Sequence, residues 1–253
     1  MTERITEGQK KQIIRVCEDA ATKATTEAVE EALLTRELAQ CVLEEGDKLQ
    51  ADLKEVVGRF ICRVSIDQRQ KEDSLADWQV FYRDEFGIAL DTASIRVPEH
   101  RKGFDRLIVV AQSLIQQAYD KCAEHFTCWK YTSANLNEAV PINDRDPANG
   151  PYAVWVRDRV EADEEHKNYS ANDLKQRGVS GITLLERLLL ELKYFRETGK
   201  HLDIRNITLC SGSRRSDGNV PHVYWDPDGR KLRVRWFNPG CAIGLLRARE
   251  VVS

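Results

Sequence analysis

The chain lacks the sequence features by which most function classes are recognised. No apolar run approaches the roughly 18 residues that span a membrane, and the first residues, 1–5, contain no apolar core of a secretory signal. No HExxH, GxSxG, GxGxxG or Walker-type motif occurs. The sequence therefore predicts no membrane partner and indicates no familiar catalytic mechanism.

The seven cysteines include no CxxC pair, which argues against a zinc ribbon. An odd, scattered set without a signal peptide is typical of reduced thiols, so we expect a cytoplasmic protein. Cys122, His125 and Cys128 resemble part of a metal site. A buried helix cysteine followed by a strand cysteine explains them better, because a free cysteine packs as a small hydrophobe. We expect no metal and no cofactor.

Composition and charge divide the chain. Of its 253 residues 42% are hydrophobic, which excludes wholesale disorder. Residues 1–100 hold 14 Lys/Arg against 21 Asp/Glu, a net charge of −7, whereas residues 101–253 hold 24 against 20, a net charge of +4. Pro98 and Gly103 suit a linker between the two parts. We predict an acidic helical region over 1–90, a linker over 91–103 and an α+β domain over 104–253.

Three helices are expected in the first part. Apolar residues recur at three-to-four spacing from Glu7 to about Leu34, from Gly46 to about Val64 and from Glu72 to Phe86. Gly87 is suited to end the third helix. The pattern predicts a small bundle or a coiled-coil arm, and we expect it to mediate self-association or contact with a protein partner.

The second part alternates strand and helix patterns, which predicts an α+β fold with a mainly antiparallel sheet and two packing helices. The helices are expected at Leu114–Phe126 and Ile182–Thr198. In the second helix Thr183 and Glu186 have capping-box spacing, Ser180 is an equally good cap, and Gly199 suits the end of the helix. Short apolar or alternating runs predict strands at 107–110, 128–131, 152–156, 207–210, 220–225 and 231–237.

Several segments of the second part form recognisable blocks: residues 143–158 (NDRDPANGPYAVWVRD), 170–175, 181–187 and 216–221. Together they resemble a family of uncharacterised bacterial proteins that share such a C-terminal region. The resemblance covers roughly Gly103 to Ser253. It implies a bacterial cytosolic protein and transfers no catalytic residue, because no activity is known for the family.

A basic hairpin is the strongest candidate for a binding surface. Basic side chains beside aromatic rings on a β-ribbon can hold phosphates and stack bases. The alternative is a solvated edge face whose arginines block edge pairing. The favoured function is therefore a non-enzymatic binding or interaction protein with an anion-facing surface, for which nucleic acid is a candidate ligand. Its predicted residues are Arg214, Arg215, Trp225, Arg230, Lys231, Arg233 and Arg235.

The competing hypothesis is a small hydrolase or phosphate-handling enzyme. It would use the loops around Asp144, Asp158–His166 and Cys210–Arg215. Each loop, taken by itself, has a simpler structural explanation or the wrong spacing for such chemistry. The segment 144–150 has its glycine one position late for a calcium loop, acidic runs are typical of solvated helix starts, and Arg215 follows Cys210 too closely for a phosphatase cradle.

Overall fold

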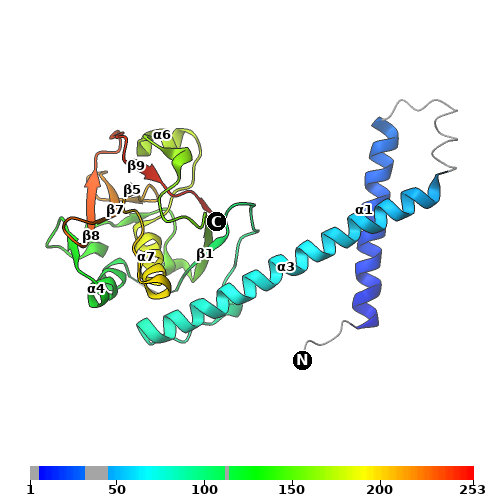
Figure 1. The fold of residues 1–253 in the computed structure, drawn as a ribbon, viewed down its shortest axis with the longest axis horizontal. Coiled ribbons are helices and arrows are strands. Elements are labelled where there is room, and N and C mark those ends of the chain that lie inside the picture. The colour runs from blue at the N-terminus through cyan, green and yellow to red at the C-terminus, as the bar shows by residue number, and fades with distance from the viewer. Residues whose placement is uncertain (1–5, 32–44, 112–113) are drawn as a thin grey trace. The chain divides into compact units, whose positions relative to one another are not determined.

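The computed structural model describes residues 6–31, 45–111 and 114–253 (Figure 1). Its contacts divide the chain into two compact units, Met1–Arg69 and Gln70–Ser253. The boundary lies earlier than the linker predicted at 91–103, because the residues just after Arg69 pack into the second unit. Among the helices that the structure describes, none combines the length and the apolar composition that a membrane crossing requires.

The first unit contains α1 (Glu7–Glu31) and the N-terminal part of α3 (Gly46–Phe86). Residues 32–44, where the first predicted helix was expected to end, lie outside the described residues. The prediction of separate helices at 46–64 and 72–86 is wrong, since α3 is one helix of 41 residues. Residues 65–71 contain neither proline nor glycine, so nothing in them interrupts the helix.

The C-terminal end of α3 belongs to the core of the second unit. Trp78, Phe81 and Tyr82 are buried, and the Trp78 indole donates to the Leu107 carbonyl at 2.9 Å. Gly87 ends the helix with φ +66°, as predicted. Residues 91–103 also pack on this unit: they contain η1 (Thr92–Ser94) and the buried Ile95.

The second unit confirms the α+β class, with its strands in three sheets (Figure 1). The first sheet is antiparallel, in the order β1 (Arg106–Val110), β4 (Tyr152–Val156), β10 (Val251–Val252). The second has the order β2 (Cys128–Lys130), β8 (Lys231–Phe237), β7 (Val220–Asp226), β5 (Ile207–Leu209), β9 (Leu246–Ala248). Its outer pairs, β2–β8 and β5–β9, are parallel. The third pairs β3 (Ile142–Asn143) with β6 (Ser213–Arg214).

Two helices pack in the main core, α4 (Ile115–His125) and α7 (Leu184–Thr198), at the places predicted. The capping box of Thr183 and Glu186 begins α7, and Gly199 ends it with φ +66°. Helix α7 is buried from Leu184 to Lys193, and it contacts α4, β1 and β7. The remaining short helices are α5 (Leu136–Ala139), η2 (Pro147–Asn149), η3 (Glu164–His166) and α6 (Ala171–Gln176).

Candidate functional site

The predicted basic hairpin is formed by β7 and β8. The antiparallel register pairs His222 with Arg235 and Tyr224 with Arg233. Strand β2 lies on the other side of β8 and places Trp129 beside Arg233. The sequence did not indicate that β2 neighbours the hairpin, because a parallel pair leaves no turn signal. This neighbour supplies the most exposed aromatic rings of the surface.

Three rings and three arginines are linked by pairwise contacts into a series that we call the aromatic–arginine strip: Trp129, Tyr131, Trp236, Arg215, Arg233 and Arg235. Because side chains alternate along β8, Trp236 lies on the side of that strand opposite to Arg233 and Arg235. The ring centroids of Trp129 and Tyr131 are 5.7 Å apart, and those of Tyr131 and Trp236 are 6.3 Å apart. Each ring carries a guanidinium: Arg233 over Trp129 at 5.4 Å, Arg235 over Tyr131 at 5.7 Å and Arg215 over Trp236 at 4.2 Å. Such cation–π contacts hold the arginine side chains beside the rings.

The strip is accessible. Tyr131 has 60% of its surface exposed and Trp129 has 36%. Trp236 is half-buried. Two neighbouring exposed aromatic side chains are more typical of an interaction site than scattered apolar residues are.

The arginines of the strip differ in their charge compensation. Arg233 forms an ion pair with Asp226 at 2.6 Å, and Arg215 forms one with Asp217 at 3.4 Å. Arg235 is exposed and has no carboxylate within ion-pair distance in the described part of the chain. Arg235 is therefore the strip residue whose charge is most available to an anion.

The other predicted binding residues lie in different surroundings. Arg230 is exposed in the hairpin turn and Lys231 is half-buried at the start of β8. Trp225 is not part of the strip: it pairs with the buried Leu232, and its ring stacks on His201 with 3.3 Å between centroids. Arg214 lies in β6 and lines a separate hollow.

The three loops of the enzyme hypothesis are only partly brought together. The β3–β6 ladder joins the Asp144 loop to residues 210–215, with the Asp144 amide donating to the Gly212 carbonyl at 2.8 Å. The acidic run 158–166 instead contacts arginines and the C-terminal segment. Asp163 accepts from Arg157 at 2.6 Å, and Glu165 accepts from Arg159 at 2.6 Å. These acids are already neutralised.

Cys210 is poorly placed to act as a nucleophile. It is fully buried, and burial raises the pKa of its thiol well above the ordinary value. The thiolate is the reactive form of a cysteine, and the raised pKa keeps Cys210 protonated. Cys210 therefore packs as a small hydrophobe. Within the described residues, no three His, Cys, Asp or Glu side chains converge to hold a metal ion.

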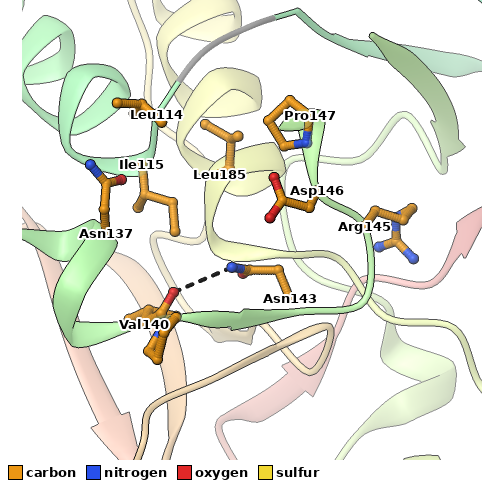
Figure 2. Close-up of a pocket in the computed structure, with 10 residues that line it drawn as sticks. Leu114, Ile115, Asn137, Val140, Asn143, Arg145, Asp146, Pro147 and Leu185 are labelled. Carbon is orange, nitrogen blue, oxygen red and sulfur yellow. Dashed lines mark hydrogen bonds between the residues drawn. The ribbon is translucent and has the colours of Figure 1, made fainter. Parts of the chain in front are cut away.

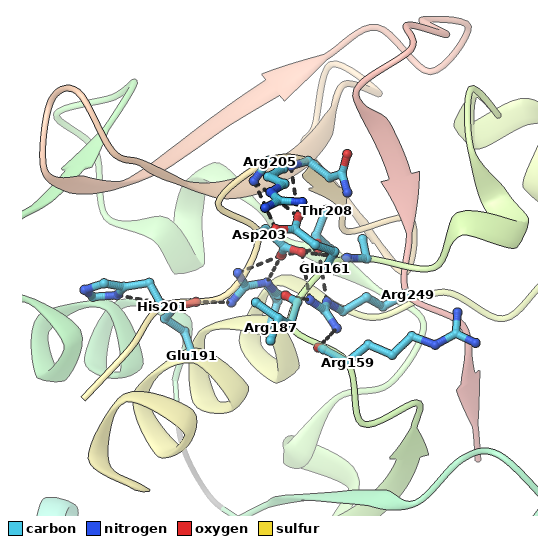
Figure 3. Close-up of polar contacts among 12 residues, drawn as sticks. Arg159, Glu161, Arg187, Glu191, His201, Asp203, Arg205, Thr208 and Arg249 are labelled. Carbon is cyan, nitrogen blue, oxygen red and sulfur yellow. Dashed lines mark hydrogen bonds and ion pairs between the residues drawn. The ribbon is translucent and has the colours of Figure 1, made fainter. Parts of the chain in front are cut away.

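The structure contains a buried ionic cluster that the sequence did not predict (Figure 3). Asp203 accepts from Arg187 Nε at 2.9 Å and from Arg249 Nη2 at 2.7 Å, and Glu191 accepts from Arg187 Nη1 at 2.7 Å. All four residues are buried. The charged residues Arg187 and Glu191, which lie among the leucines of α7, are the sequence feature that could have indicated the cluster. The cluster connects α7 to the segments around Asp203 and Arg249, and its charges are paired with one another.

A small hollow of about 120 Å³ lies beside the Asp144 loop (Figure 2). Ile115 and Leu185 form its apolar side, and Asn143 and Asp146 its polar side. Both polar side chains are engaged: Asn143 donates to the Val140 carbonyl at 3.3 Å, and Asp146 accepts from the Ala148 amide at 2.8 Å. These two polar side chains of the hollow therefore already have hydrogen-bond partners within the loop.

Comparison with known proteins adds no further constraint. No protein-family model, curated protein or solved structure matches this chain.

Proposed function

We propose that this chain is a binding protein that holds single-stranded nucleic acid on the aromatic–arginine strip. The observation that carries the proposal is the unbroken series of three rings, Trp129, Tyr131 and Trp236, each accompanied by an arginine. Single-strand binders combine these two elements: rings on which bases stack, and cations that follow the phosphates.

The exposure of the rings favours single strands over duplexes. Bases offer their faces to a side chain only when they are unstacked, which is the state of single strands and loops. Tyr131 is the ring with the most free surface. Arg235, Arg230 and Lys231 provide cations along the same hairpin. Since the whole chain carries a net charge of −3, the attraction is local to this face.

The test is fluorescence anisotropy with labelled single strands of about 12 nucleotides, a length within the site sizes of such proteins. RNA, DNA and a duplex of the same sequence are titrated at about 50 and 200 mM salt. We expect saturable binding of a single strand that weakens with salt. Tyr131→Ala should raise the Kd by about tenfold, since stacking contributes about 1–3 kcal/mol per base.

A matched control lies elsewhere in the second unit. The guanidinium of Arg177 lies 4.3 Å from the ring centroid of Tyr169, so this pair resembles Arg235 and Tyr131 without belonging to the strip. Arg235→Gln should reduce the salt dependence, whereas Arg177→Gln should leave it unchanged. Equal effects of the two variants, or absence of saturable binding at low salt, would refute the proposal.

A second function rests on the first unit, which we propose associates with a second copy of the chain. Apolar side chains are exposed on both of its helices, including Ile13 and Ile14 on α1 and Val56 and Phe60 on α3. Exposed helices of this kind gain most of their stability from packing. Residues 1–69 hold 11 Lys/Arg against 14 Asp/Glu, so two copies would repel each other only weakly.

The mass of the full chain in solution, measured by light scattering, tests this association. We expect a dimer or larger assembly that Val56→Ser with Phe60→Ser converts to monomer. Val80→Ser is the control, because Val80 is an exposed residue of the same helix in the second unit. A monomeric wild-type chain would contradict the association.

A further inference from the structure

A hollow of about 410 Å³ opens beside the β3–β6 ladder, and neither proposal above uses it. The ladder pairs Ile142 with Arg214 and Asn143 with Ser213. Because side chains alternate along a strand, Ile142, Asp144 and Arg214 share one face of the ladder. All three line the hollow, together with Leu174, Lys175 and Val179 from α6 and the residues that follow it. We call it the β3–β6 pocket.

Arg214 lacks the partner that comparable arginines of this chain have. Arg145 is bound to Glu186 at 2.7 Å and Arg157 to Asp163 at 2.6 Å. Arg214 is half-buried, yet no carboxylate of the described residues lies within ion-pair distance of it. Its Nη1 donates to the carbonyls of Ser211 and Ser213 at 2.6 and 2.7 Å, and neither Nε nor Nη2 donates a hydrogen bond to the described chain.

The surroundings of Arg214 disfavour its charge. Burial lowers the pKa of its guanidinium, and the nearby Asp144 only partly offsets that effect. A buried or half-buried charge is costly unless it is paired. An anionic ligand in the pocket would provide the missing pair, and a guanidinium suits a carboxylate because its planar fork donates two parallel hydrogen bonds.

Asp144 gives the pocket a charge of the opposite sign. Its backbone is fixed by the hydrogen bond to the Gly212 carbonyl at 2.8 Å. Asp144 and Arg214 are diagonal neighbours on the ladder, at a typical separation of about 7–8 Å between backbones. They are not ion-paired with each other within the described contacts. The pocket thus presents the carboxylate of Asp144 and the guanidinium of Arg214 as two separate charged groups that do not pair with each other.

The pocket also offers apolar surface. Ile142 is an exposed large hydrophobic residue, with 54% of its surface accessible, and the half-buried Val179 is part of the same lining, whereas Leu174 is fully buried beneath it. Lys175 is exposed at the same hollow and adds a second cation. Ligand sites commonly combine such an apolar surface with a few polar groups that fix orientation.

We propose that the β3–β6 pocket binds a free α-amino acid with an apolar side chain. The ligand carboxylate lies on Arg214, its ammonium on Asp144 and its side chain against Ile142 and Val179. Lys175 strengthens the attraction for the carboxylate. A simple anion would satisfy Arg214 but would face the carboxylate of Asp144, so the pairing of both charges favours a zwitterion.

Isothermal titration of the full chain with leucine, two leucine analogues and inorganic phosphate tests the proposal. Leucinamide lacks the carboxylate, N-acetyl-leucine lacks the ammonium, and inorganic phosphate is a plain oxyanion. We expect leucine to bind and each of the three probes to bind at least about tenfold more weakly, which corresponds to about 1.4 kcal/mol for each lost charge pairing. These comparisons use the wild-type chain, so they do not depend on the folding of any variant.

Variants then assign the two charges. Arg214→Gln and Asp144→Asn should each weaken leucine binding by at least about tenfold, whereas Arg215→Gln should not, because Arg215 lies on Trp236 and does not line the pocket. Leucine should leave oligonucleotide binding unchanged, which separates this site from the strip. Absence of heat with millimolar leucine would overturn the proposal. So would phosphate or N-acetyl-leucine binding as tightly as leucine.

Discussion

The buried carboxylate of Asp203 gives the sharpest test of how this domain is held together. Its Oδ1 accepts from the Ala162 amide at 2.8 Å and from Arg249, and its Oδ2 accepts from Arg187 and from the Thr208 hydroxyl (Figure 3). Burial by itself would raise the pKa of Asp203, but the charges of Arg249 and Arg187 hold it below the ordinary value. Asp203 is therefore charged in the folded protein at neutral pH.

Asp203→Asn removes the charge and keeps the size of the side chain. Asparagine has the same shape, and it tolerates the left-handed backbone of this position, where φ is +53°. The new amide group turns an acceptor into a donor that faces other donors. Arg187 keeps Glu191 at 2.7 Å, but Arg249 loses its acidic partner. Breaking a buried pair in this way costs about 3–5 kcal/mol, a large part of a typical stability of about 5–15 kcal/mol.

Urea unfolding followed by tryptophan fluorescence measures this loss. All five tryptophans of the chain lie after residue 70, so the signal reports the second unit. With a slope of about 2 kcal/mol per molar urea, the midpoint should fall by about 2 M. The exposed Asp217→Asn should leave the midpoint unchanged. A folded Asp203→Asn variant that loses less than about 1 kcal/mol would refute the argument for an uncompensated buried charge.

Three further predictions follow from the second unit. Ser213→Ala should lower the free energy of unfolding by about 1–3 kcal/mol, because the Ser213 hydroxyl accepts a hydrogen bond from the first amide of α7 at 2.8 Å. Ser211→Ala should be neutral or stabilising, because the buried Ser211 hydroxyl has no partner among the described residues. Equal losses of stability for the two variants in urea unfolding would contradict this. Burial and the charge of Arg235 lower the pKa of His222 to about 3, so His222 stays neutral in the fold and becomes protonated on unfolding below about pH 6.5. Stability should therefore fall as the pH falls from about 6.5 toward 3, and His222→Phe should remove up to about 1.4 kcal/mol per pH unit of that slope in urea titrations at several pH values. A chain that begins at Gln70 should retain the cooperative unfolding of the second unit, whereas one that begins at Asp91 should lose it. The shorter chain lacks three buried aromatic residues of α3, which contribute about 1.5–3 kcal/mol each. Equal thermal unfolding of the two chains would move the N-terminal boundary of the second unit to Asp91 or beyond.

Local signals predicted individual elements well. Strand β8 has the predicted bounds, 231–237, since its apolar residues alternate with basic ones and a strong turn precedes it. Helix α7 begins at the predicted capping box because Thr183 and Glu186 satisfy each other's amides. Both features depend on neighbours within a few residues, which is the range over which sequence patterns carry information.

Features that depend on distant partners were not predictable in the same way. The parallel pairing of β2 with β8 has no connecting turn, so nothing local indicated that Trp129 lies beside Arg233. The position of Trp225 could have been derived from the hairpin itself. Once a four-residue turn is assumed, Trp225 faces the inward Leu232 and so belongs with the core.

Four arginines of the second unit differ in whether a carboxylate is paired with them. Arg187 and Arg249 are buried and paired with acids, so their charges serve the fold. Arg235 and Arg214 have no such pair within the described residues, and they lie at the two surfaces that we propose as binding sites. Salt should distinguish the two. Exposed charges such as Arg235 are screened within about 10 Å at 0.1 M salt, whereas the half-buried Arg214 is screened less. Oligonucleotide binding should therefore weaken steeply with salt, while amino-acid binding at the β3–β6 pocket should change little over the same range.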